Sequence, residues 1–509
     1  MSSESNRRIA KNTMMLYFRM LLTMAVSLYT SRIVLNTLGV EDFGIFNVVG
    51  GFVTMFAFLN SAMASATQRF LAFEIGKGDK IQLRNVFSMS IIIHFLIAFI
   101  ILIFAETVGL WFVNTHLNIT NERMVAARWV YQFSILTLMV NMVSVPYNAM
   151  IIAHERMNVF AWVSIAEVCL KLFIVFMLQW FEFDKLKLYA ILIFAVTIII
   201  RMIYGAYCNI NFKESKFRYY WDKPLFKTLA SYAAWNLWGN AAGVIMGQGV
   251  NILLNIFFGP MVNAARGIAY QIKSAVNSFV QNFQIAMNPQ IIKSFAADDL
   301  KYMHQLIYQG SKYSFFLLFT LTLPIFFEAE IILRLWLKNV PEYTVIFTRL
   351  VIINVLIDCI SGPLMTAAQA SGKIKLYQGV VGGLLIVNLP VAYLFLKFGY
   401  EPEVTLFVSI GISIIALFAR LKIIAPLVDF KIWDYSKAVL LRIIAVGFIA
   451  IILPGLAYTF MQESFYRIII IGIFSILSAG CTVYFVGLGN AEQAIILTKA
   501  KQYFPKLKS

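Results

Sequence analysis

Apolar segments of about 20 or more residues recur from one end of this 509-residue chain to the other. Each is long enough to cross a hydrocarbon core about 30 Å thick at a rise of roughly 1.5 Å per helical residue. Because 60% of the residues are hydrophobic and 13% are charged, most of the surface must face lipid rather than water. The pattern predicts an all-α, polytopic membrane protein. We expect about fourteen spans, near residues 12–38, 42–74, 84–113, 126–151, 157–181, 187–212, 225–258, 261–295, 303–328, 344–370, 374–397, 403–427, 437–460 and 465–488.

The Lys and Arg residues of the loops predict the orientation of the chain. Basic loop residues are retained on the cytoplasmic side of a membrane. One alternate set of loops and termini carries about 25 of them and the other set about 7. Both termini are therefore expected in the cytoplasm, with the protein in a bacterial inner membrane, and this requires an even number of spans. The apolar run after residues 1–11 is too long for a signal peptide, so we expect it to be a retained first span.

The two halves of the sequence share several landmarks. The pairs are Leu35-Asn36 and Leu254-Asn255, Gly39 and Gly259, Ser144-Val145-Pro146 and Ser361-Gly362-Pro363, and Arg156 and Lys373, with offsets of 217 to 220 in the numbering. Six spans separate the copies, so both copies have the same orientation. We therefore predict two pseudo-symmetric six-helix lobes related by an axis along the membrane normal. The predicted organisation is an N-lobe at 1–212, a cytoplasmic linker at 213–224, a C-lobe at 225–428, two C-terminal helices at 429–490 and a basic tail at 491–509.

Three segments resemble a known family. The segment from Thr30 to Gly51, TSRIVLNTLGVEDFGIFNVVGG, and the following MASATQRFLAFEIGKGD resemble the first two helices of bacterial Wzx-type polysaccharide flippases. The later ASGKIKLYQGVVGG, from Ala370 to Gly383, is similar to the turn before the eleventh helix of that family. These flippases belong to the multidrug/oligosaccharidyl-lipid/polysaccharide (MOP) exporter superfamily, which also contains the MATE transporters.

The resemblance implies a function that composition and periodicity do not show. It implies that an undecaprenyl-diphosphate-linked repeat unit of O-antigen, capsule or exopolysaccharide is moved from the cytoplasmic to the periplasmic leaflet by alternating access of the two lobes. The expected partners are this lipid-linked oligosaccharide, membrane lipids and the polysaccharide polymerase machinery. Related lipid-diphosphate flippases use arginines on the first and eighth helices, which here correspond to Arg32 and Arg266.

Basic residues inside the predicted spans are candidates for substrate binding. A charge in hydrocarbon costs roughly 2.5 to 3.5 kcal/mol on insertion scales, so it is expected to face a watery cavity or the interior of the bundle. Arginine suits a diphosphate because its paired N–H donors match phosphate oxygens. The alternative for Arg19 and Arg32 is that they extend to the membrane interface. The candidates are Arg19, Arg32, Arg201, Arg266 and Lys273, with Asn255 among the many amide side chains of the seventh and eighth helices.

Acidic residues within the spans are candidates for ion or proton coupling. Glu167 and Lys171 are four residues apart, a spacing that favours a structural ion pair on one helix face. Asp358 has no neighbouring base in the sequence, so it is expected either to relay a proton or to form an interhelical hydrogen bond.

No catalytic, metal or cofactor site is expected. The four histidines are far apart in the sequence, and no nucleophile elbow, H-E-x-x-H or phosphate-binding glycine loop occurs. Cys169, Cys208, Cys359 and Cys481 have no metal-ligand spacing. The net charge of +17 is scattered through loops, which argues against nucleic acid as a partner.

Three other functions compete with flipping. A multidrug antiporter of the same fold would favour unpaired acids in its cavity, whereas buried cations predominate here. A polytopic polymerase or acyltransferase usually needs a large extracytoplasmic loop or a polar catalytic cluster, and neither is visible. The third alternative is a scaffold without transport activity.

Overall fold

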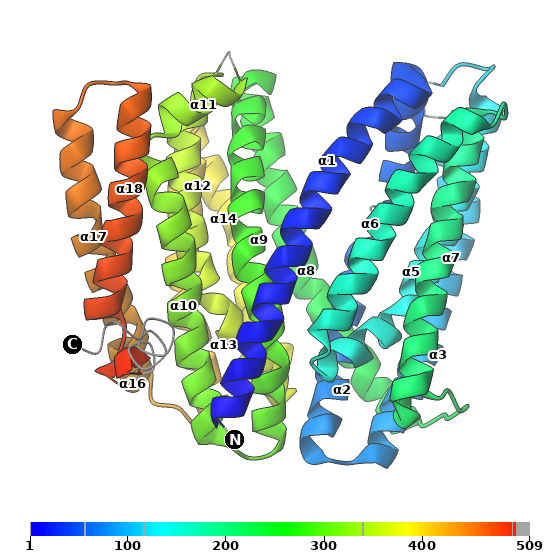
Figure 1. Ribbon diagram of the computed structural model, residues 1–509, viewed down its shortest axis with the longest axis horizontal. Coiled ribbons are helices and arrows are strands. Elements are labelled where there is room, and N and C mark those ends of the chain that lie inside the picture. The colour runs from blue at the N-terminus through cyan, green and yellow to red at the C-terminus, as the bar shows by residue number, and fades with distance from the viewer. Residues whose placement is uncertain (1, 55–56, 116–118, 338–339, 491, 495–509) are drawn as a thin grey trace, which may run out of the picture. The chain divides into compact units, whose positions relative to one another are not determined.

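The computed structural model describes residues 2–54, 57–115, 119–337, 340–490 and 492–494. Regular structure in these ranges is helical throughout, without a strand, so the predicted all-α class is confirmed (Figure 1). The longer helices are α1 (Ser2–Thr54), α2 (Ala57–Lys77), α3 (Lys80–Phe104), α5 (Met124–Ala153), α6 (Met157–Trp180), α7 (Lys185–Asn211), α8 (Lys223–Phe258), α9 (Pro260–Ala296), α10 (Leu300–Phe327), α12 (Thr344–Cys359), α13 (Ser361–Ser371), α14 (Ile374–Lys397), α15 (Val404–Ile424), α17 (Leu441–Phe460) and α18 (Phe465–Thr482). The short helices are α4 (Leu110–Thr115), α11 (Ala329–Leu337) and α16 (Ile432–Tyr435).

Eleven helical segments of the described chain are long and apolar enough to cross a membrane. Each matches a predicted span to within a few residues, as Met157–Trp180 matches 157–181. The three remaining predicted spans fall on α1, on the end of α1 with α2, and on α9, which are helical but do not belong to the eleven. The count of fourteen is therefore not confirmed. In α9 the abundant Asn and Gln side chains lower the hydropathy.

The backbone repeats with the same separation as the sequence. Gly39 interrupts α1 and Gly259 separates α8 from α9; their offset in the numbering is 220, and their φ angles are 81° and 79°. Only glycine adopts such angles readily, because it has no Cβ. Helices α6 and α14 both begin and end at an offset of 217 from one another. Local geometry thus follows the repeat that the sequence landmarks suggest.

Two further pairs of positive φ angles obey the same offsets, and in each pair one member is not glycine. Gly78 has a φ of 75°, and Asp298, at an offset of 220, has 59°. Glu155 has a φ of 59°, and Gly372, at an offset of 217, has 75°. A left-handed conformation costs a non-glycine residue about 1–2 kcal/mol. Contacts elsewhere must therefore hold Glu155 in place.

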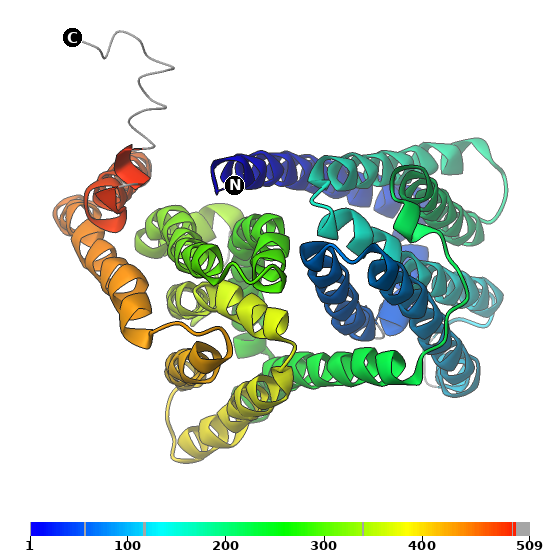
Figure 2. The same ribbon diagram turned by 90° about the horizontal axis from the view of Figure 1, so that it is seen from below.

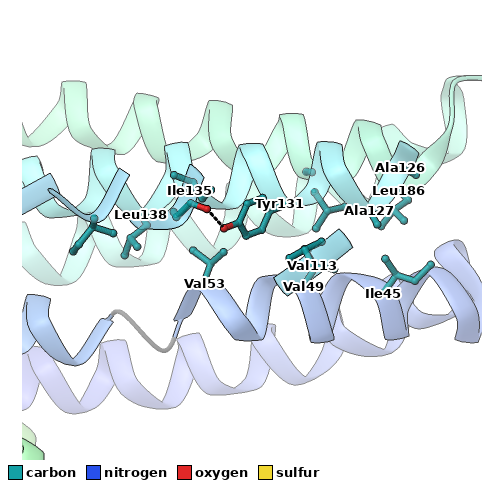
Figure 3. Packing of buried hydrophobic residues seen from close by; sticks show 14 of the residues in the cluster. Ile45, Val49, Val53, Val113, Ala126, Ala127, Tyr131, Ile135, Leu138 and Leu186 are labelled. Atoms are coloured by element: carbon teal, nitrogen blue, oxygen red, sulfur yellow. Dashed lines mark hydrogen bonds between the residues drawn. The ribbon is translucent and has the colours of Figure 1, made fainter. Parts of the chain in front are cut away.

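Residues Met1–Ala241 and Ile285–Asp299 pack together as one compact unit, here called unit 1. Its core includes Val49, Val53 and Ile135, together with the fully buried Tyr131 (Figure 3). The Tyr131 hydroxyl donates a hydrogen bond to the Ala105 carbonyl at 2.7 Å. Ala105 begins a π-helical turn between α3 and α4, and such turns depart from regular helical hydrogen bonding. The tyrosine therefore supplies a donor where the backbone pattern changes.

One end of unit 1 is fixed by a three-residue ion cluster. Arg123, immediately before α5, donates to Asp42 Oδ1 from Nε at 2.8 Å and to Asp184 Oδ2 from Nη1 at 3.0 Å. Asp184 also caps α7 by accepting hydrogen bonds from two of its first backbone amides. The cluster connects the segment after Gly39 to the starts of α5 and α7.

The second compact unit, unit 2, contains Ala242–Gln284 and Leu300–Ser509. Its last two long helices, α17 and α18, lie side by side (Figure 2). Helix α18 also packs against α10. There Arg467 donates to both carboxylate oxygens of Glu328, at 2.8 and 3.0 Å, and the Glu328 side chain is 1% exposed. Because the unit division falls within α8 and α9, the predicted lobe limits remain a prediction.

Candidate functional site

A cavity of about 690 Å³ with a mixed apolar and polar lining lies within unit 1. Helices α1, α2, α5, α6 and α7 supply its walls. The lining combines aromatic rings, small hydroxyl and amide side chains, and two charged residues of the predicted site, Glu167 and Arg201. Such a mixture of apolar wall and a few polar groups is typical of ligand sites.

Arg201 of α7 is the cation of this cavity. Its guanidinium carbon lies 3.8 Å from the centre of the Tyr147 ring, a cation–π contact with α5. Gly205, one turn later, leaves room for the guanidinium, since a Cβ at that position would lie 2.8 Å from Nη1. Within the described ranges, Arg201 has no ion-pair or hydrogen-bond partner. Its charge is therefore available to a ligand.

Glu167 lines the same cavity but is already neutralised. Lys171 Nζ lies 2.6 Å from Glu167 Oε1, so the ion pair predicted from their spacing forms. Both side chains are about a third exposed, at 36% and 37%. The pair leaves Arg201 as the uncompensated charge among the described lining residues.

Arg19 of α1 lies behind the cavity wall. Its Nη1 is 3.5 Å from Ser164 Oγ, and its guanidinium carbon is 4.7 Å from the centre of the Phe160 ring. Ser164 and Phe160 both line the cavity. Arg19 thus contacts two residues of the cavity wall, and its role in substrate binding remains a prediction. The side chain of Arg32 lies outside the part of the chain that the structure describes.

Arg266 belongs to unit 2 and is held by neutral acceptors. It is 6% exposed and donates to Asn251 Oδ1 at 3.0 Å and to the Gly247 carbonyl at 3.1 Å. Its guanidinium carbon also lies 4.2 Å from the centre of the Tyr270 ring. These contacts connect α9 to α8 and satisfy some of the N–H donors of the Arg266 guanidinium. No carboxylate among the described residues pairs with Arg266.

Lys273 and Asp358 form an ion pair that the sequence did not indicate. Their Nζ and Oδ2 atoms are 3.9 Å apart, and the side chains are 24% and 40% exposed. Asp358 has no neighbouring base in the sequence, but α9 supplies one from a distant part of the chain. Asn354, one turn before Asp358, donates instead to Ser413 Oγ at 3.0 Å.

Asn255 lies near the end of α8 and is exposed. Its backbone carbonyl accepts a hydrogen bond from the Gly259 amide at 2.9 Å, which closes the last turn of the helix. Asn255 and Gly259 thus mark the end of α8, as Asn36 and Gly39 mark the corresponding point of α1. The role of the Asn255 side chain in substrate binding remains a prediction.

Sequence reasoning missed a set of polar residues on α5. Ser134, Thr137, Asn141, Ser144 and Asn148 all line the unit 1 cavity. Their spacing of three and four residues places them on one helix face and was visible in the sequence. None of the five is charged, so a charge inside an apolar segment, the signal that marks Arg201, does not mark them.

The described residues contain no group of three or more His, Cys, Asp or Glu side chains that could hold a metal ion. The four cysteines are free.

A family profile described as "Polysaccharide biosynthesis protein" matches residues 9–295, more than half of the chain. The chain belongs to this family. The match spans every helix that lines the unit 1 cavity. No curated protein matches this polysaccharide biosynthesis protein significantly in sequence.

Solved structures show the fold of the family member. An outward-facing MATE-family multidrug resistance transporter of the MOP superfamily has a TM-score of 0.71 at 12% identity, covering 83% of this chain and 96% of that one. The MATE transporter ClbM, solved with Rb⁺, has a TM-score of 0.70 at 15% identity, covering 84% and 97%. A MOP superfamily transporter from Pyrococcus furiosus, described as having a binding pocket of reverse polarity, has 0.66 at 13% identity, covering 83% and 96%.

The family profile and the eleven candidate spans together indicate a multi-pass membrane protein of the polysaccharide biosynthesis family, and the solved structures show that it has the fold of MATE transporters. The resemblance of its sequence to polysaccharide flippases of that superfamily is confirmed. At these identities, the solved structures indicate the fold alone.

Proposed function

We propose that this polysaccharide biosynthesis protein moves an undecaprenyl-diphosphate-linked oligosaccharide, the repeat unit of an O-antigen, capsule or exopolysaccharide, from the cytoplasmic to the periplasmic leaflet. One observation carries the proposal: Arg201 lines the cavity of unit 1, and no described residue neutralises it. An arginine without a neighbouring carboxylate attracts phosphate oxygens strongly, because its charge-assisted N–H donors match their geometry. The diphosphate of the cargo supplies the missing charge.

The proposed orientation of the chain in the membrane follows from the charges of its loops. About 25 basic residues lie on one side of the predicted topology and about 7 on the other, which favours cytoplasmic termini in the inner membrane. Membrane lipids surround the spans, and the polysaccharide polymerase machinery is the expected recipient of the flipped cargo. Transport proceeds by alternating access of the two predicted lobes, 1–212 and 225–428.

The structure-based competitor is multidrug transport, because solved structures of that fold carry that description. A cationic drug needs an uncompensated acid. In the described chain, Glu167 of the unit 1 cavity is bonded to Lys171, and Asp358 of unit 2 lies beside Lys273. The charge balance within each unit therefore favours an anionic cargo.

The test uses cells that lack this gene and proteoliposomes that contain the purified protein. Loss of the gene should cause lipid-linked repeat units to build up in the cytoplasmic leaflet. In proteoliposomes, a fluorescent polyprenyl-diphosphate sugar should become accessible to an external quencher, and Arg201→Gln should slow this step by about tenfold or more. Arg128→Gln, an exposed arginine outside the cavity, is the control and should leave the rate unchanged.

Two results would contradict the proposal. One is normal export, without any build-up, in the cells that lack the gene. The other is protection of cells from cationic drugs by a protein that leaves the fluorescent lipid in its original leaflet. The second result would favour multidrug transport.

A further inference from the structure

The polar residues of α5 form a continuous line along one helix face. Ser134, Thr137, Asn141, Ser144 and Asn148 follow one another at intervals of three, four, three and four residues, and all five line the unit 1 cavity. We call this set the α5 stripe. Hydroxyl and amide groups at that regularity are expensive against lipid, so a hydrated or ligand-filled space must face them.

Two amide oxygens in the cavity wall are buried without a hydrogen-bond partner among the described residues. They are Oδ1 of Asn148, in the α5 stripe, and Oδ1 of Asn60, on α2. Buried polar atoms are normally satisfied, and an orphaned acceptor needs a donor. An ionised diphosphate offers acceptors and no donor. The group that satisfies these two oxygens must therefore carry O–H or N–H groups.

In the second repeat, the polar side chains at the same positions have partners within unit 2. Three residues of the α5 stripe have polar counterparts 217 positions later in the sequence. Asn354 corresponds to Thr137, Asp358 to Asn141 and Ser361 to Ser144. All three are bonded within unit 2: Asn354 to Ser413 at 3.0 Å, Asp358 to Lys273 at 3.9 Å, and Ser361 to Arg420 at 2.9 Å. In unit 1, Thr137 and Asn141 have no partner among the described residues. The polar side chains at these positions are therefore paired in unit 2, whereas Thr137 and Asn141 in unit 1 remain free to bind a ligand.

We propose that the α5 stripe binds the sugar next to the diphosphate and sets the sugar specificity of transport; this inference rests on the proposed function. A pyranose ring presents hydroxyl groups at its edge, which both donate and accept, and apolar C–H groups on its faces. The stripe supplies the matching amides and hydroxyls. Phe46, Phe133 and Phe160 line the same cavity and supply apolar surface. Arg201 holds the anionic end, so recognition of charge and of sugar lies on two adjacent helices, α7 and α5.

The experiment measures transport of a defined panel of probes in proteoliposomes. The probes are polyprenyl diphosphates that carry glucose, galactose or their 2-acetamido derivatives, together with sugar-free polyprenyl diphosphate. The variants are Asn141→Leu, Asn148→Leu and the smaller Asn148→Ala, with Gln179→Leu as the control on an exposed site of α6. Size-exclusion profiles and thermal unfolding identify any variant that fails to fold, and Asn148→Ala removes the amide without added bulk if Asn148→Leu does not fold.

The wild type should transport one sugar faster than the others by about tenfold, the value of one or two hydrogen bonds. Each α5 substitution should reduce that preference to about threefold or less, because the favoured sugar loses its hydrogen bonds, while Gln179→Leu should retain the preference. Unaltered sugar preference in folded Asn141 and Asn148 variants would overturn the inference and leave the proposed function standing. Failure of the wild type to move any probe would instead contradict the proposed function.

Discussion

The side chain of Gln284 donates a hydrogen bond to the backbone carbonyl of Cys359 at 3.1 Å. Pro363 has no N–H, so it leaves this carbonyl, four residues earlier, without its helical partner. Ser311 of α10 donates to the next carbonyl, that of Ile360, at 2.9 Å. An unsatisfied backbone group in lipid costs several kcal/mol. Side chains of α9 and α10 therefore stabilise the break between α12 and α13.

Gln284→Leu should destabilise unit 2, because the Cys359 carbonyl then loses its donor. We expect a loss of about 1–3 kcal/mol, measured as a lower melting temperature of the purified protein in detergent. Gly362→Ala should act similarly, since a Cβ at residue 362 would collide with the Gln284 amide. Gln281→Leu, at an exposed position of α9, is the control. Equal melting temperatures for the Gln281 and Gln284 variants would show that the hydrogen bond from Gln284 to the Cys359 carbonyl does not stabilise unit 2.

Glu155 combines a left-handed backbone with a buried carboxylate. Its side chain is 1% exposed, accepts hydrogen bonds from Lys293 and Gln290, and lies 3.6 Å from Arg8. The Asn12 side chain donates to the Glu155 carbonyl at 3.1 Å. The turn between α5 and α6 is thereby fastened to the start of α1 and the end of α9, all within unit 1.

Substitutions at Glu155 should distinguish the backbone contribution to stability from the side-chain contribution. Glu155→Ala loses the carboxylate and keeps the unfavourable φ of 59°, whereas Glu155→Gly loses the carboxylate and relieves the strain. Both should melt below the wild type, because Lys293 is left with its charge unpaired. The alanine variant should be the less stable of the two by about 1–2 kcal/mol. The reverse order would show that the backbone at residue 155 is not strained.

His154 gives the same turn a pH dependence. Burial against Phe212, whose ring is stacked on it at 4.1 Å, together with the nearby Lys293, lowers the pKa of His154 to about 4. An unfolded chain binds this proton below about pH 6.5 and the folded chain only near pH 4, so stability should fall as pH drops through this window. The slope should not exceed about 1.4 kcal/mol per pH unit for one proton. His154→Phe should flatten the melting temperature between pH 6.5 and 4, and an unchanged profile in that variant would exclude His154 as the cause.

The buried pair of Arg467 and Glu328 should be essential for docking α18. Arg467→Met leaves the Glu328 carboxylate buried and unpaired, which should cost about 3–5 kcal/mol, measured by thermal unfolding. Combining it with Glu328→Leu should restore most of the loss, because no isolated charge remains. The exposed pair of Arg334 and Glu463, 3.0 Å apart, provides the matched control and should contribute less than about 1 kcal/mol. Without recovery in the double variant, the pair would have a role other than mutual neutralisation.

Sequence reasoning identified charged residues within the spans but not their neighbours in space. Arg201, Arg266 and Lys273 were identified because a charge is conspicuous in an apolar segment. The pairing of Lys273 with Asp358 and the neutral acceptors of Arg266 were not predictable, because their partners lie on other helices. The Glu167–Lys171 pair was predictable, because both residues belong to one turn of one helix.

That this chain is a helical membrane protein built on a repeat follows from its residues alone. Lipid imposes its constraint on each segment separately, so hydropathy and glycine-marked helix ends are readable without knowledge of packing. Which charges are neutralised, and which remain open as Arg201 does, became clear only from the packing of the helices. That outcome depends on distances of a few ångströms between helices far apart in the chain, and spacing along one helix carries no information about them.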